Sequence, residues 1–102
     1  MKAKLIAAGI SISFFTAAGL AWAGDPYAGS AIYASHCVSC HGGDGSGEVA
    51  GTPSFRGGKL MSKSEFELRD KIRMGKALMP GFGGILTQQQ IEDVVTYIRT
   101  FN

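Results

Sequence analysis

The most regular hydrophobic pattern in the chain lies near its C-terminal end. Apolar side chains recur there at intervals of three and four positions, at Ile91, Val94, Val95 and Ile98. This spacing places all of them on one face of an α-helix. Thr87, followed three residues later by Gln90, forms a capping-box pattern that marks the start of the helix. We therefore predict a C-terminal amphipathic helix with a buried apolar face, flanked by Tyr97 and Phe101.

A second, more polar helix is predicted to end at about Met74. Ser62 or Ser64 can cap its start, and Gly75 stops it. Its first turn is acidic, its last turn is basic, as the helix dipole prefers, and its apolar stripe is short. These residues are Glu65 and Glu67, then Lys71 and Arg73, with Leu68 and Ile72 as the stripe. Phe66 lies off that stripe, and we expect it to cover the end of the core.

The N-terminal helix is predicted from its cap. Asp25 is a favoured N-cap residue, and Pro26 suits the first helical position because an N–H there has no partner. The helix is predicted to run from Tyr27 to about Cys40. Gly29 leaves room on it for another element to approach closely, although simple tolerance of glycine near a helix start explains it equally well.

Glycine punctuates the segment that follows. Seven glycines fall between residues 42 and 58, with few apolar residues among them. A compact domain rarely keeps so long an irregular segment unless it wraps a functional object. The chain shows neither an alternating strand pattern nor an internal repeat. The sequence therefore predicts an all-α fold in which three or more helices are joined by Gly-rich loops.

The first 23 residues differ from the rest of the chain. Two lysines precede an uncharged stretch (residues 5–20), and Ala-Trp-Ala (21–23) places small residues where a signal peptidase inspects them. This pattern predicts a secretory signal peptide over residues 1–23. The alternative, an uncleaved membrane anchor, is disfavoured because the apolar run falls short of the ~20 residues that a spanning helix usually needs. Residues 24–102 then form a single domain that is exported to the periplasm and keeps no stable membrane anchor.

Removal of this segment changes the charge balance. The whole chain carries ten basic and eight acidic residues, a formal net charge of +2. Lys2 and Lys4 leave with the signal peptide, so the domain keeps eight of each sign and a net charge of zero. This balance gives no support to nucleic-acid or anionic-membrane binding. A domain this small has a marginal core and usually depends on a disulfide, a metal or another staple.

The segment His-Cys-Val-Ser-Cys-His (residues 36–41) brings three reactive groups together. On a helix Cys37 and Cys40 share one face, and His41 projects close to them. The pattern Cys-x-x-Cys-His is typical of c-type haem attachment, in which two thiols add to the vinyl groups of the haem and the imidazole reaches the iron.

Three alternatives use the same cysteines. Zinc needs four ligands, and His36 is the one further Cys or His of the exported domain, which leaves the site one ligand short. A thioredoxin-like redox pair expects a neighbouring βαβ pattern, which the chain lacks. A disulfide between Cys37 and Cys40 is chemically allowed in an oxidising compartment. We favour the haem, and expect His36 to be an exposed helix residue.

Four segments, in this order, resemble those of the class I cytochromes c. They are a first helix with the haem motif (GSAIYASHCVSCHGGDG), a proline loop (GTPSF), a methionine loop (LMPGF) and a last helix (LTQQQIEDVVTYIRTF). The resemblance covers nearly all of residues 24–102. It implies the cytochrome c fold around one haem c, attached covalently through Cys37 and Cys40, with His41 as an axial ligand of the iron.

The resemblance also implies a second axial ligand. Met79 matches the family's methionine loop, and because Pro80 follows it, its backbone is biased toward an extended conformation. Met74 is expected to be a core or haem-edge residue instead, and Met61 to pack under the Gly-rich loop. Pro53 matches the proline whose carbonyl accepts the second ring N–H of the ligating histidine, the alternative being that it only shapes the loop.

Two further matches concern packing and the propionates. The family packs a small residue of its first helix against an aromatic residue of its last, which here implies contact between Gly29 and Tyr97. Trp22 belongs to the predicted signal peptide, so the domain lacks the tryptophan that bonds a haem propionate in some members. Arg56 and Lys59 are the candidates for that role.

With both axial positions filled by protein, an iron exchanges single electrons and does not readily bind gases or peroxide. The resemblance therefore implies a non-enzymatic electron carrier, a monomer that meets redox proteins transiently at its exposed haem edge. Lys59, Lys71, Arg73 and Lys76 are expected to flank that edge and to steer an acidic partner. Two alternatives stay open: a haem sensor or minor peroxidase in which Met79 is displaceable, and a subunit of a larger oxidoreductase.

Overall fold

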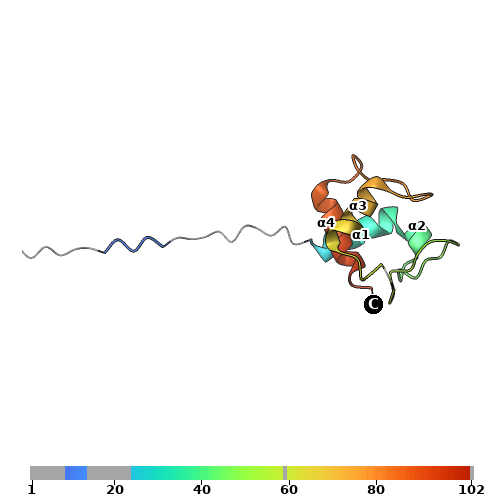
Figure 1. The fold of residues 1–102 in the computed structure, drawn as a ribbon, viewed down its shortest axis with the longest axis horizontal. Helices are drawn as coiled ribbons and strands as arrows, with labels where there is room; N and C mark the ends of the chain where they lie inside the picture. Colours follow the sequence, from blue (N-terminus) through green and yellow to red (C-terminus); the bar gives the residue numbers. More distant parts are fainter. Residues whose placement is uncertain (1–8, 14–23, 59, 102) are drawn as a thin grey trace, which may run out of the picture.

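The computed structural model describes residues 9–13, 24–58 and 60–101. Within these ranges the helices are α1 (Pro26–His36), α2 (Val38–His41), α3 (Glu65–Met74) and α4 (Gln88–Ile98). No strand forms in the described part of the chain, where the loops hold two isolated β-bridges. Helix α4 packs against both α1 and α3 (Figure 1). The predicted all-α architecture is confirmed.

The predicted signal peptide falls mostly outside the described residues. Of residues 1–23 the structure describes 9–13, which form no helix. The cleavage after Ala23 therefore stays a prediction. In the ranges given above, no helix has both the length and the apolar character needed to cross a membrane.

Helix α1 begins as predicted but ends earlier. The Asp25 carboxylate accepts a hydrogen bond from the Tyr27 N–H at 2.8 Å and so caps the helix. The helix ends before Cys37, whose φ of −120° and ψ of −31° depart from helical values, and α2 then continues to His41. The predicted helical stretch from Tyr27 to about Cys40 is therefore present but is interrupted at Cys37, which divides it into α1 and α2.

Helices α3 and α4 have the predicted caps. Ser64, and not Ser62, caps α3, because its hydroxyl accepts from the Glu67 N–H at 3.1 Å. Gly75 ends α3 with a φ of +73°, which favours glycine. Thr87 and Gln90 exchange both hydrogen bonds of the capping box, at 3.1 and 2.8 Å.

The hydrophobic core lies around α4 and includes the predicted apolar stripes of α3 and α4. Its buried members are Tyr33, Phe55, Leu68, Ile72, Phe82, Leu86, Ile91, Val94, Val95 and Ile98. Phe66 and Met74 are 67% and 70% exposed, because they lie on the face of α3 opposite Leu68 and Ile72. The expectation that Phe66 covers the end of the core is therefore wrong, and of the two places expected for Met74, the core or the haem edge, the core is excluded.

A second set of contacts ties α4 to the chain that precedes α3. The Arg99 guanidinium donates to the Met61 carbonyl at 2.7 Å and to the Lys63 carbonyl at 2.6 Å. Within α3, Arg69 forms an ion pair with the largely buried Glu92 of α4. These bonds fix where the chain emerges from the Gly-rich loop.

Helices α1 and α4 approach each other closely at Gly29. A Cβ atom at this position would lie 2.0 Å from the Asp93 carbonyl oxygen and 2.9 Å from the Tyr97 Cβ. One turn further along α1, the ring of Tyr33 packs against that of Tyr97, with centroids 5.3 Å apart. The expected packing of Gly29 against Tyr97 is confirmed.

Gly29→Ala is therefore expected to lower the free energy of unfolding by about 3 kcal/mol, the upper part of the overpacking range. The new methyl group meets backbone atoms of α4, so the two helices must separate. Denaturant unfolding of the purified protein measures the loss. As a control, Ala31→Gly on the exposed face of α1 should cost only the difference in helix propensity, about 1 kcal/mol. A neutral or stabilising Gly29→Ala would contradict the close approach.

Candidate functional site

The two cysteines lie at the junction of α1 and α2, and both are free thiols. Cys37 is the residue at which the helix kinks, and it packs half-buried against the core. Cys40 lies on α2 and is exposed. Burial, reinforced by the neighbouring Cys40, raises the pKa of Cys37 to about 11. At neutral pH the Cys37 side chain is therefore a neutral thiol, and it lies one helical turn from Cys40.

His41 ends α2 and is only 8% exposed. Its ring stacks on that of Phe55, with centroids 4.5 Å apart and an interplanar angle of 21°. Burial lowers the pKa of His41, and the Pro53 backbone acts against this shift. The Pro53 carbonyl is close enough to raise the pKa of His41. It does not form a hydrogen bond with the ring, since the buried Nδ1 of His41 has no hydrogen-bond partner within the described ranges. A neutral imidazole is the form that binds metals.

The Gly-rich segment, residues 42–58, folds back onto α2 and places Phe55 beside His41. The Gly47 N–H donates to the His41 carbonyl at 2.8 Å, and the Phe55 N–H donates to the Gly45 carbonyl at 2.7 Å. Gly47 has a φ of +86°, and a Cβ atom there would lie 2.5 Å from a backbone carbonyl oxygen across the loop. The prediction that this loop is long and irregular is confirmed, and its contacts show that it holds the histidine.

Tyr33 and Phe55 are two residues of this region whose roles the sequence did not indicate. The Tyr33 hydroxyl donates to the Gly42 carbonyl at 2.6 Å, in the buried turn that follows α2. Burial is the main reason why the pKa of Tyr33 is raised to about 12, so the hydroxyl stays a donor at neutral pH. The one available signal was the residue type. Tyr33 is a large aromatic residue on the Gly29 face of α1, and Phe55 is a large aromatic residue in an otherwise polar loop.

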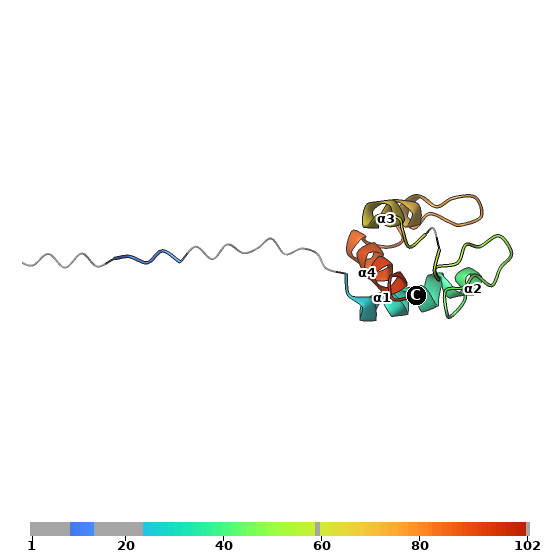
Figure 2. The same cartoon turned by 60° about the horizontal axis from the view of Figure 1, so that its bottom comes forward.

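Met79 lies in a tight turn that follows α3. Lys76 and Met79 exchange backbone hydrogen bonds at 3.1 and 3.0 Å across Ala77, whose φ is +54°, and Leu78, which is 98% exposed. Met79 itself packs half-buried against the core, as Met61 also does. Both views show this loop and α2 projecting from the same end of the molecule and facing each other (Figures 1 and 2).

The remaining predicted residues lie at the margin of the site. His36 is exposed, as expected, and its ring contacts the edge of Phe82 with centroids 5.6 Å apart. Arg56 is exposed on the Gly-rich loop. Lys59 lies outside the described residues, so its assignment to a propionate stays a prediction. The structure thus brings Pro53, Phe55 and His41 together, beside the two thiols.

Comparison with known proteins identifies the family. The family model described as cytochrome c oxidase, cbb3-type, subunit III matches residues 24–98. Cytochrome c6 of Gloeothece citriformis is 33% identical over 87 residues, which cover 76% of this chain and 73% of that protein.

Solved structures show the same fold. A c-type cytochrome named KustC0563 matches with a TM-score of 0.66 and 26% identity, over 72% of this chain and 95% of its own. Cytochrome c6 from the diatom Phaeodactylum tricornutum matches with a TM-score of 0.64 and 28% identity, over 74% of this chain and 91% of its own. The cytochrome c fold is therefore confirmed, and the chain belongs to the class I cytochromes c, as a small protein with a single haem.

Proposed function

We propose that this protein is a periplasmic electron carrier whose haem c is attached through Cys37 and Cys40 and ligated by His41 and Met79. The observation that carries the proposal is the state of His41. Its imidazole is buried, favoured in the neutral form, and directly follows two free thiols. Such a donor set fits haem c, since vinyl groups take the thiols and iron takes the imidazole nitrogen.

The residues around His41 would hold its ring in place. Phe55 stacks on the imidazole and restricts its rotation. The buried Nδ1 needs an acceptor, and we expect it to donate to the nearby Pro53 carbonyl in the loaded protein, which fixes the ring and raises its basicity. The bound haem supplies reversible one-electron chemistry between Fe(III) and Fe(II).

Met79 is the methionine best placed to supply a second protein ligand to the iron of a bound haem. Its loop faces α2, and its side chain is half-buried, whereas Met74 is 70% exposed on α3. A thioether favours reduced iron and raises the potential, as a carrier requires. Met61 is the competitor, because it is also half-buried against the core.

An absorption spectrum of the purified protein, oxidised and reduced, with a denaturing pyridine treatment, tests the function. We expect the sharp reduced bands of a covalently held low-spin haem and, in the oxidised protein, the weak red band of sulfur bound to iron. Haem without that band would contradict Met79 and favour the sensor or peroxidase alternative. A protein without haem would leave Cys37 and Cys40 as a disulfide pair.

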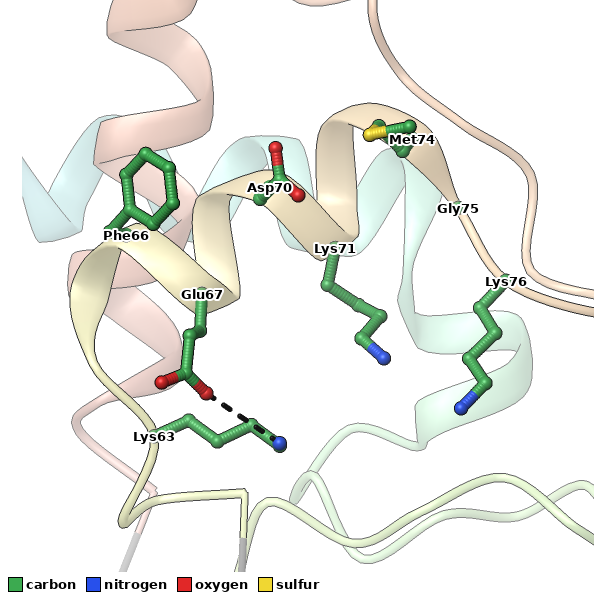
Figure 3. Close-up of a pocket in the computed structure, with 8 residues that line it drawn as sticks. All are labelled: Lys63, Phe66, Glu67, Asp70, Lys71, Met74, Gly75 and Lys76. Carbon is green, nitrogen blue, oxygen red and sulfur yellow. Dashed lines mark ion pairs between the residues drawn. The ribbon is translucent and has the colours of Figure 1, made fainter.

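The outer face of α3 is the proposed source of electrostatic steering toward an acidic redox partner. Figure 3 shows Lys71 and Lys76 extending over one hollow. In the same hollow the Lys63 ammonium forms an ion pair with the Glu67 carboxylate, at 3.6 Å. Lys71 and Lys76 form no ion pair with any residue in the described ranges, whereas Arg73 pairs with Asp70. We therefore assign the attraction of an acidic partner to Lys71 and Lys76, although the net charge of the predicted exported domain is zero.

Reversing both charges, with Lys71→Glu and Lys76→Glu, is expected to slow oxidation of the reduced protein by an anionic reagent about tenfold at low salt. A cationic oxidant should become faster, and both differences should vanish near 1 M salt because exposed charges are screened. Stopped-flow absorbance measures the rates. Lys63→Gln, at the neutralised position, is the control. If the double variant and the parent protein reacted at the same rate with each reagent, the proposed steering would be wrong.

The description of the matching family favours a second candidate, a haem subunit within a larger oxidoreductase. Co-purification from gently solubilised cells, followed by native mass measurement, distinguishes the two. A stable complex of fixed composition supports the subunit, and a free monomer supports the carrier.

A further inference from the structure

Asp93 is a buried carboxylate on α4 that the proposed haem site does not use. Its side chain is 6% exposed, and Oδ1 accepts from the Asp25 N–H and from the Gln89 side-chain amide, both at 2.8 Å. No cationic side chain of the described residues pairs with it, whereas its neighbour Glu92 is paired with Arg69. A buried carboxylate held only by neutral donors is costly, so the surroundings of Asp93 favour a cation.

Gly24 lies against the same stretch of α4. A Cβ atom on Gly24 would lie 2.0 Å from the Thr96 Oγ1 and 2.4 Å from the Glu92 carbonyl oxygen, so the backbone itself packs on the helix. The next residue, Asp25, donates its N–H to Asp93. Three covalent bonds separate the Gly24 nitrogen from the Asp25 nitrogen, so the two atoms are at most about 4 Å apart.

We propose that export processing creates an ion pair between the Gly24 α-ammonium and the Asp93 carboxylate, which fastens the start of α1 to α4. Hydrolysis of the Ala23–Gly24 peptide bond adds water, leaving a carboxylate on Ala23 and an amine on Gly24 that is protonated at neutral pH. In the precursor the same nitrogen is an uncharged amide. The proposal rests on the predicted cleavage after Ala23 and is independent of the iron ligands.

The test compares two forms of the mature, haem-loaded protein that differ in one group. In one form the chain starts at Gly24. In the other, made by semisynthesis, an acetyl group on Asp25 replaces Gly24 and reproduces its backbone atoms without the ammonium. Deleting the ammonium should raise the unfolding equilibrium constant about tenfold, the scale of a partly buried ion pair. With Asp93→Asn, which keeps the acceptor for Asp25, the change should fall below about twofold.

A third form keeps the test valid should Asp93→Asn not fold. One additional glycine ahead of Gly24 preserves the charge but moves it by one residue, and it should lose the same stabilisation as the acetyl form. Tenfold losses in both forms support the ion pair. An unchanged equilibrium in either, or the same loss with and without Asp93→Asn, overturns it.

Mass measurement of the exported protein separates this proposal from the others. A chain that does not begin at Gly24 overturns both the cleavage site and the ion pair. The haem spectrum should be the same in all these forms, because none of them alters a proposed ligand. A lost or altered spectrum in the native form would instead count against the proposed function.

Discussion

Replacing both cysteines, with Cys37→Ala and Cys40→Ala, is expected to leave a largely unfolded chain. The predicted exported domain has 79 residues, residues 24–102, a size at which the core alone rarely sustains a fold. Its long Gly-rich loop contributes one buried apolar side chain, Phe55, to the core. A covalently held haem adds apolar surface at about 25 cal/mol per Å² buried, and without the thioether bonds that contribution becomes reversible.

Circular dichroism and a thermal melt of the double variant measure the effect. Ser39→Ala is the matched control, because Ser39 is exposed between the two cysteines and the variant keeps both thiols. The control should melt cooperatively like the parent protein. A double variant that keeps native-like helical content and a cooperative melt would show that the protein core suffices, and the dependence on haem would be wrong.

The helices were predictable where local chemistry decides them. The capping box of α4, the Ser64 cap and Gly75 stop of α3, and the Asp25 cap of α1 are all set by residues within one turn. The apolar stripe of α4 was predictable for the same reason, since a single period of 3.6 residues fixes it. These elements agree with the structure because sequence neighbours determine them.

The connections between helices were not predictable in this way. Arg99 bonds carbonyl groups 38 and 36 positions away, and no periodicity indicates those partners. The kink at Cys37 is set by backbone angles at one residue within a pattern that would suit a continuous helix. Phe66 and Met74 were misplaced because an apolar side chain on a polar helix does not indicate which face meets the core.

The site shows the same division. The order of Cys37, Cys40 and His41 was visible in the sequence, and the resemblance assigned Pro53 to the neighbourhood of His41. The stacking of Phe55 on His41 needed the loop to fold back through Gly47, a contact made by backbone groups that carry no sequence signal. Short motifs therefore predict the chemistry of the site, whereas the loop contacts that orient its residues can be seen only in the structure.

Met79→Ala is expected to convert the carrier into a haem protein that binds external ligands. Without the thioether the iron of the bound haem would lack one protein ligand, so the reduced protein should bind carbon monoxide and the red sulfur-to-iron band should disappear. The midpoint potential should fall by an amount on the order of 0.1 V, within the ≈ 0.8 V span that axial ligands control. Absorption spectra and a redox titration measure these changes. The parent protein should not bind carbon monoxide at neutral pH; binding there would favour the sensor or peroxidase alternative.

Two matched variants decide which methionine is the ligand. Met74→Ala removes a thioether that is exposed on α3 and should leave the band and the potential unchanged. Met61→Ala removes one that is half-buried, like Met79, but lies in a segment held by Arg99. It should lower stability by ~2 kcal/mol, at the lower end of the range for buried methionine, and keep the band. If Met61→Ala loses the band while Met79→Ala keeps it, the ligand is Met61, because both thioethers are half-buried and the band reports which of them binds the iron.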